Sequence, residues 1–183
     1  MLSASIRIAA RLLVVAALAA TTAGCFQPMY AEHADGTPGL REKLMGVDIP
    51  PVNKANASRE ARVGVEIRNA LAFKLYGTAT GMQPTHRLDM RFQTSRSSLI
   101  IDPNTGLPNS ENYGIDVQYN LIDIASNKSV MTGTTFSRVS YDMPGSYQRF
   151  SRQRAVRNAE DRAANEIAEN ISTRLAAFFT AGT

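Results

Sequence analysis

A strict alternation of apolar and polar residues near the middle of the chain limits the folds that it can adopt. From residue 113 to residue 121 every second side chain is apolar, and the positions between them include Asp116, Gln118 and Asn120. Successive side chains of a β-strand point to opposite faces, so this segment predicts a strand with one buried and one exposed face. A second layer must cover its apolar side, which consists of Tyr113, Ile115, Val117, Tyr119 and Leu121.

Three other segments have the patterns of strands. Residues 88–93 alternate in the same way, and residues 130–141 form a longer segment that is rich in Thr and Ser. A short candidate over residues 44–49 is stopped by two prolines, which cannot continue a sheet ladder. Turn-forming residues at 102–109 and 125–128 separate the three longer strands, so we expect these strands to be consecutive and mostly antiparallel.

Two segments have the period of an α-helix. The first covers residues 58–77, with Ser58 as a candidate N-cap and Gly77 as a candidate stop. The second closes the chain, and its charged pair Glu160-Asp161 is expected on an ion-paired surface. Its apolar residues recur every three or four positions and form one stripe: Val156, Ala159, Ala163, Ile167, Ile171, Leu175 and Phe178.

These elements follow one another in the order β-α-β-β-β-α. Three consecutive strands between two helices favour an α+β sandwich, with both helices packed on one face of a mostly antiparallel sheet. We expect a single domain of this kind over residues 44–183.

The N-terminal residues have the layout of a secretory signal peptide. Residues 1–24 contain no Asp or Glu, and a short apolar run follows two arginines. The run is too short for the roughly 20 residues that span a bilayer. Thr22-Ala23-Gly24-Cys25 resembles a bacterial lipobox, and Cys25 has no second cysteine with which to form a disulfide. We therefore expect cleavage after residue 24, acylation of Cys25, and a tether over residues 25–43.

The positive charge of the chain invites a nucleic-acid interpretation, which other features disfavour. The formal net charge is +4, but removal of the signal peptide would also remove Arg7 and Arg11. The remaining basic residues are interleaved with acidic ones, and export would separate the protein from nucleic acid. No nucleic-acid partner is expected.

The chain resembles the LptE family, the lipopolysaccharide-assembly lipoproteins of the Gram-negative outer membrane. The resemblance rests on residues 24–30 at the anchor, on Ile67-Arg68-Asn69-Ala70-Leu71, on the paired strands over 113–121 and 130–141, and on the Ala-rich closing helix. It implies a protein anchored to the inner leaflet of the outer membrane, on the periplasmic side. It also implies that this protein plugs an LptD barrel, assists assembly of the barrel, and helps deliver lipopolysaccharide to the outer leaflet. The alternative is an outer-membrane-anchored scaffold of unrelated role.

The residue inventory does not favour an enzyme. Only His33 and His86 are present, and the sequence has no Cys/His cluster at metal-ligand spacing and no Gly-rich phosphate loop. We expect no catalytic residues, no metal and no cofactor.

Two groups of cations are candidates for contact with the phosphates of lipopolysaccharide. Arg87 and Arg91 project from the same side of a strand, opposite the apolar side chains, and are expected to form one exposed patch with other cations. We call this patch the strand set: Arg87, Arg91, Arg96, Lys128 and Arg138. The alternative is an ordinary solvated sheet face.

The second group lies at the start of the closing helix. If this helix begins near Ser146, four arginines crowd the positive end of its dipole, which is locally unfavourable unless an anion lies nearby. If the helix begins near Ser151, they are merely solvated. We call this group the helix set: Arg149, Arg152, Arg154 and Arg157.

Overall fold

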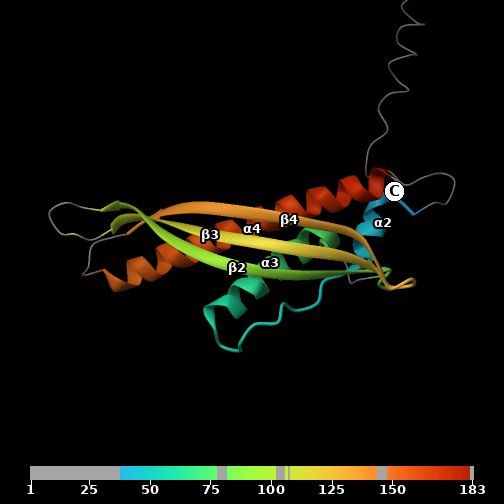
Figure 1. The fold of residues 1–183 in the computed structure, drawn as a ribbon, viewed down its shortest axis with the longest axis horizontal. Coiled ribbons are helices and arrows are strands. Elements are labelled where there is room, and N and C mark those ends of the chain that lie inside the picture. The colour runs from blue at the N-terminus through green and yellow to red at the C-terminus, as the bar shows by residue number, and fades with distance from the viewer. Residues whose placement is uncertain (1–37, 78–81, 102–105, 107, 144–147, 182–183) are drawn as a thin grey trace, which may run out of the picture. The chain divides into compact units, whose positions relative to one another are not determined.

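The computed structural model describes residues 38–77, 82–101, 106, 108–143 and 148–181. Cys25, the signal peptide and most of the expected tether lie outside these ranges. Three long strands form one layer and helices lie behind them (Figure 1). In chain order the elements are α2 (Leu40–Met45), β1 (Val47–Asp48), α3 (Arg59–Tyr76), β2 (His86–Ile101), β3 (Pro108–Asp123), β4 (Lys128–Asp142) and α4 (Arg149–Ala181).

The four strands form one mixed sheet in the order β1-β2-β3-β4. The tiny strand β1 runs parallel to β2, whereas the two hairpins that join the long strands are antiparallel. Because directly opposite residues share a face of the sheet, the register decides which side chains meet. Met90 lies opposite Tyr119, and Phe92 lies opposite Val117, so the apolar positions of β2 and β3 form one continuous surface.

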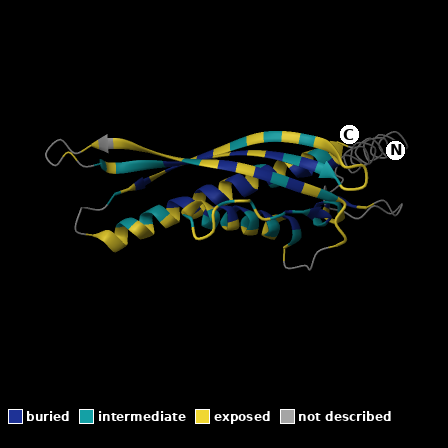
Figure 2. Ribbon diagram, turned by 60° about the horizontal axis from the view of Figure 1, so that its bottom comes forward, coloured by how far each residue is buried: buried dark blue, intermediate teal, exposed yellow. Residues whose placement is uncertain are grey.

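The helices cover one face of the sheet, as the sequence predicts (Figure 2). The predicted apolar positions of β3, from Tyr113 to Leu121, are all buried, and so are Leu88, Met90 and Phe92 of β2. They pack in one core with side chains from α3 and α4. The α+β sandwich is therefore confirmed.

Local sequence signals explain why α3 begins and ends where it does. The Ser58 hydroxyl accepts a hydrogen bond from the Ala61 N–H at 3.0 Å, as an N-cap does. The helix stops at Gly77, whose φ of 65° lies in the left-handed region that favours glycine. The predicted core positions Val63, Ile67 and Leu71 are buried.

The closing helix α4 is 33 residues long and starts at Arg149, between the two expected starts. Five of the seven predicted stripe residues are buried, and Val156 and Phe178 are half-buried. Three additional alanines beside the stripe are also buried: Ala164, Ala168 and Ala176. Figure 2 shows that the first turns of α4 are much more exposed than the turns that follow.

Two boundaries differ from the expected ones. Residues 40–43 are not tether but the first turn of α2, so the domain begins at Leu40 rather than at residue 44. Leu40 and Leu44 are one helical turn apart, and both are buried in the core. The strand expected over residues 44–49 consists of two residues, because α2 already occupies its first positions. The Lys43 ammonium also donates to the carbonyl of Phe179 near the end of α4, at 3.3 Å.

Candidate functional site

Three cations of the strand set lie on the outer face of the sheet, away from the helices. Arg87 and Arg91 are exposed on the same side of β2, as strand alternation predicts, and Arg138 is exposed on β4. Two of the three already have an acidic partner. Arg87 lies 3.3 Å from Asp89, and Arg138 binds both carboxylate oxygens of Asp116, the nearer at 2.7 Å.

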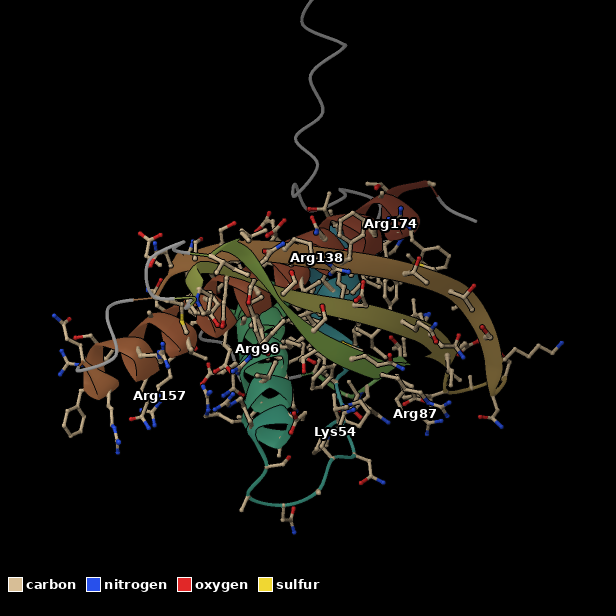
Figure 3. All side chains as sticks on the ribbon, turned by 60° about the vertical axis from the view of Figure 1, so that its left-hand side comes forward. Lys54, Arg87, Arg96, Arg138, Arg157 and Arg174 are labelled. Carbon is tan, nitrogen blue, oxygen red and sulfur yellow. The ribbon has the colours of Figure 1, made fainter. Side chains whose placement is uncertain are left out.

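The strand set does not form one compact patch. Arg91 is opposite Gln118, whereas Arg138 is opposite Gly114, four positions earlier in β3. At about 3.3 Å per residue, this separates the two cations by roughly 13 Å along the strand. Lys128 is opposite Asp123 at the end of the hairpin. Arg87 and Arg138 are accordingly well apart in Figure 3.

The placement of Arg96 in the strand set is wrong. Arg96 is an even number of positions from Phe92, so strand alternation turns it to the helix-covered face instead of the outer face. Its opposite residue is the buried Tyr113, and its guanidinium lies 5.6 Å from the centre of the Tyr113 ring. The side chain is only 35% exposed.

The partner of Arg96 is Glu160, which corrects a second expectation. Glu160 does not belong to an ion-paired surface, because its side chain is 0% exposed. Its carboxylate accepts a hydrogen bond from Arg62 of α3 and one from Arg96 of β2, the latter at 3.4 Å. The Arg59 guanidinium lies 3.7 Å from it. One buried anion of α4 thus joins cations from two other elements.

The three arginines that surround Glu160 line a hollow of about 270 Å³ at the junction of α3, β2 and α4. We call it the arginine pocket, and it is lined by Arg59, Arg62, Arg96, Arg152, Gln153, Val156 and Arg157. Among the four α4 residues, Arg152 lies one helical turn before Val156, and Gln153 lies one turn before Arg157, so each pair is adjacent on the helix surface. Arg149 and Arg154 of the helix set are exposed and do not line the pocket. In Figure 3, Arg157 lies near the start of α4, and Arg96 lies between it and Arg87.

The electrostatics of the arginine pocket favour an anion. Five guanidinium groups line it, and Glu160 supplies a single buried negative charge beside them. The first turns of α4 add the positive end of a helix dipole. Arginine presents five N–H donors in a planar fork that matches phosphate and carboxylate groups. Burial, and to a smaller extent the negative charge of Glu160, raises the pKa of Tyr113 to about 12. The phenol that contacts the Arg96 guanidinium therefore stays neutral near neutral pH.

The pocket combines predicted and unpredicted residues. Arg96 comes from the strand set, and Arg152 and Arg157 come from the helix set, but sequence reasoning did not select Arg59 and Arg62. Their spacing of three residues, directly after the N-cap, places both on one side of the first turn of α3. The sequence also indicates that Glu160 faces the core, because it lies four residues after Val156 and seven before Ile167, in line with the apolar stripe.

A broader groove of about 1540 Å³ crosses the three long strands. Its charged lining residues are three cations and two acids: Lys54, Arg91, Arg174, Asp89 and Asp116. Its charges are therefore mixed, in contrast to those of the arginine pocket.

Two other kinds of feature are absent from the part of the chain that the structure describes. No three His, Cys, Asp or Glu side chains gather there in a way that could hold a metal ion. No helix in those ranges combines the length and the apolar character needed to cross a membrane.

Comparison with solved structures shows what the fold resembles. A protein from Caulobacter crescentus CB15, described as a lipoprotein, has a TM-score of 0.60 and 20% identity, with 77% of this chain and 96% of that chain covered. This likeness concerns the fold alone. The minor lipoprotein of Acinetobacter baumannii has a TM-score of 0.47 and 14% identity, over 72% of this chain and 88% of that one.

Comparison of the sequence with protein families gives a more specific result. No curated protein sequence matches the chain. The model of the LptE family, described as lipopolysaccharide-assembly, matches residues 44–175. The matched region runs from α2 into the last turns of α4, so it includes the whole sheet and the arginine pocket. This chain belongs to the LptE family.

Proposed function

We propose that this protein is an outer-membrane lipoprotein that acts in lipopolysaccharide assembly as the plug and assembly partner of an LptD-type barrel. The single observation that carries the proposal is the family match over residues 44–175, which supports a role in lipopolysaccharide assembly. The lipobox supports an acyl anchor on Cys25. More than one acyl chain makes such anchoring stable, because each buried methylene adds about 0.8 kcal/mol.

The proposal includes direct contact with lipopolysaccharide. The ligand carries phosphate and carboxylate groups, which charge-assisted hydrogen bonds from arginine recognise well. The proposed role of the protein is binding and assembly, without a chemical reaction, a metal or a cofactor. A periplasmic scaffold of unrelated role is the alternative, and it requires no barrel partner.

Co-purification tests the proposal. Full-length chain, tagged at its C-terminus and extracted from membranes with mild detergent, should bring down a barrel protein several times its own mass. Cys25→Ser is the matched control, because it changes the anchor and leaves the described domain intact. This variant should appear in the soluble fraction or as an uncleaved precursor, without labelled fatty acid. Wild-type chain that is acylated but captures no barrel would favour the unrelated scaffold.

A further inference from the structure

We propose that the arginine pocket is a binding site for one phosphate ester group of a lipid, and that Glu160 is the residue that positions its arginines. In naming a lipid-linked phosphate, this inference rests on the proposed function.

Most donors of the pocket remain available to a ligand. Arg62 and Arg96 each donate one hydrogen bond to Glu160, and Arg59 approaches it at 3.7 Å. Among the described residues, no carboxylate lies within 4.0 Å of Arg152 or Arg157. Five like charges around one hollow repel one another, and one carboxylate offsets only part of this repulsion. A bound dianion would offset the remainder.

The pocket is arranged before any ligand arrives. Glu160 is fully buried and holds Arg62 and Arg96, which come from α3 and β2. Arg96 also lies over the ring of Tyr113, which helps to hold it in place. Arginine side chains normally lose rotamer freedom when they bind, so this arrangement lowers the entropic cost of binding. Glu160 would act through the arginines, without touching the ligand.

The size of the pocket limits the ligand. Pockets that enclose drug-sized molecules are roughly 300–1,000 Å³. The arginine pocket, at about 270 Å³, lies just below that range. It holds water-sized molecules easily, since one water needs only ~10–15 Å³ measured this way. It therefore fits one anionic group with its hydration, while the rest of the ligand lies outside.

Exposed apolar side chains at the same end of the sheet favour a lipid source over free phosphate. Phe150 is 82% exposed and lies two residues before Arg152, and Leu99 and Ile101 are exposed at the end of β2. The end of β2 and the start of α4 lie at the same end of the sheet (Figure 1). A cationic pocket flanked by apolar side chains matches an amphiphile whose phosphate carries acyl chains.

Binding of lipid A to full-length protein in detergent micelles tests the inference. The probes are diphosphorylated lipid A, the same lipid after phosphatase treatment, and inorganic phosphate. The double variant Arg152→Gln/Arg157→Gln removes two pocket cations that do not contact Glu160. Because a charge-assisted hydrogen bond lost costs roughly ten- to a hundredfold in affinity, the variant should bind diphosphorylated lipid A at least tenfold more weakly. Wild-type protein should bind phosphatase-treated lipid A about as weakly as the double variant binds diphosphorylated lipid A.

The matched control is Arg149→Gln/Arg154→Gln, which removes the same charge from the same turns of α4 but outside the pocket. It should bind diphosphorylated lipid A like the wild type. Arg87→Gln/Arg91→Gln should behave in the same way. Equal losses of lipid A affinity in the pocket and control variants would overturn the inference, and so would a loss of affinity in the strand variant alone. It would also be overturned if the wild-type protein bound lipid A equally well with and without its phosphates, or if it bound inorganic phosphate as tightly as diphosphorylated lipid A. If the barrel still co-purifies in any of these cases, the inference fails and the proposed function stands.

Discussion

Replacing Ile171 with Ala should lower the free energy of unfolding by about 2–5 kcal/mol, as large-to-small changes in a packed core do. Ile171 is 0% exposed, and it lies on the stripe of α4 that packs against α3 and the sheet. The loss has two causes, namely the lost burial of three carbons and the cavity they leave. Urea titration followed by far-ultraviolet circular dichroism measures it.

Glu169→Ala is the control for this prediction, because Glu169 lies two residues away on the same helix. Its side chain is 62% exposed, and its ion pair with Lys74 lies at the surface. Exposed pairs contribute about 0–1 kcal/mol, so this variant should unfold at nearly the wild-type urea concentration. Equal losses in the two variants would mean that the stripe is not the buried side of α4.

The second large effect is expected at Glu160. Glu160→Ala should destabilise the fold by roughly 2–4 kcal/mol, because it leaves partly buried guanidinium groups without their anion. The loss should stay below the largest values for buried ion pairs, since Arg59, Arg62 and Arg96 are 53%, 36% and 35% exposed and keep some water. Thermal melting at low and high salt measures it, and salt should reduce the loss by screening the repulsion.

Glu160→Gln separates the charge of this residue from its shape. The amide keeps an acceptor oxygen for one arginine but no negative charge, so its cost should lie between those of wild type and Glu160→Ala. If Glu160→Ala melts like the wild type at low salt, Glu160 does not hold the arginines together. The positioning role proposed for it would then be wrong.

Much of the fold could be predicted because periodicity reports burial directly. The alternation from Tyr113 to Leu121 and the stripe from Ala159 to Leu175 both correspond to buried positions. The helix α2 was missed because its six residues are too few to show a period, and the prolines and glycines before it resemble a tether. Its helical state depends on packing, through Leu40 and Leu44, more than on local preference.

The candidate site was harder to predict, for two different reasons. Arg96 was grouped with the cations of the outer face, although the alternation of side chains along β2 places it on the inner face. For Arg59, Arg62 and Glu160, the sequence gives each residue's side of its own helix but not which helices meet. Residues 62 and 160 come into contact only because α3 and α4 pack together, and no local pattern encodes that contact.

If this chain acts in lipopolysaccharide assembly as proposed, lipopolysaccharide should not reach the outer leaflet without it, and the amount of lipopolysaccharide on the cell surface can be measured. The chain should be depleted from the bacterium that makes it, and surface lipopolysaccharide should be labelled on intact cells with an impermeant probe. We predict that surface labelling falls while total lipopolysaccharide persists, and that the wild-type chain restores it. Unchanged surface labelling in cells that lack the chain would contradict a role in lipopolysaccharide assembly.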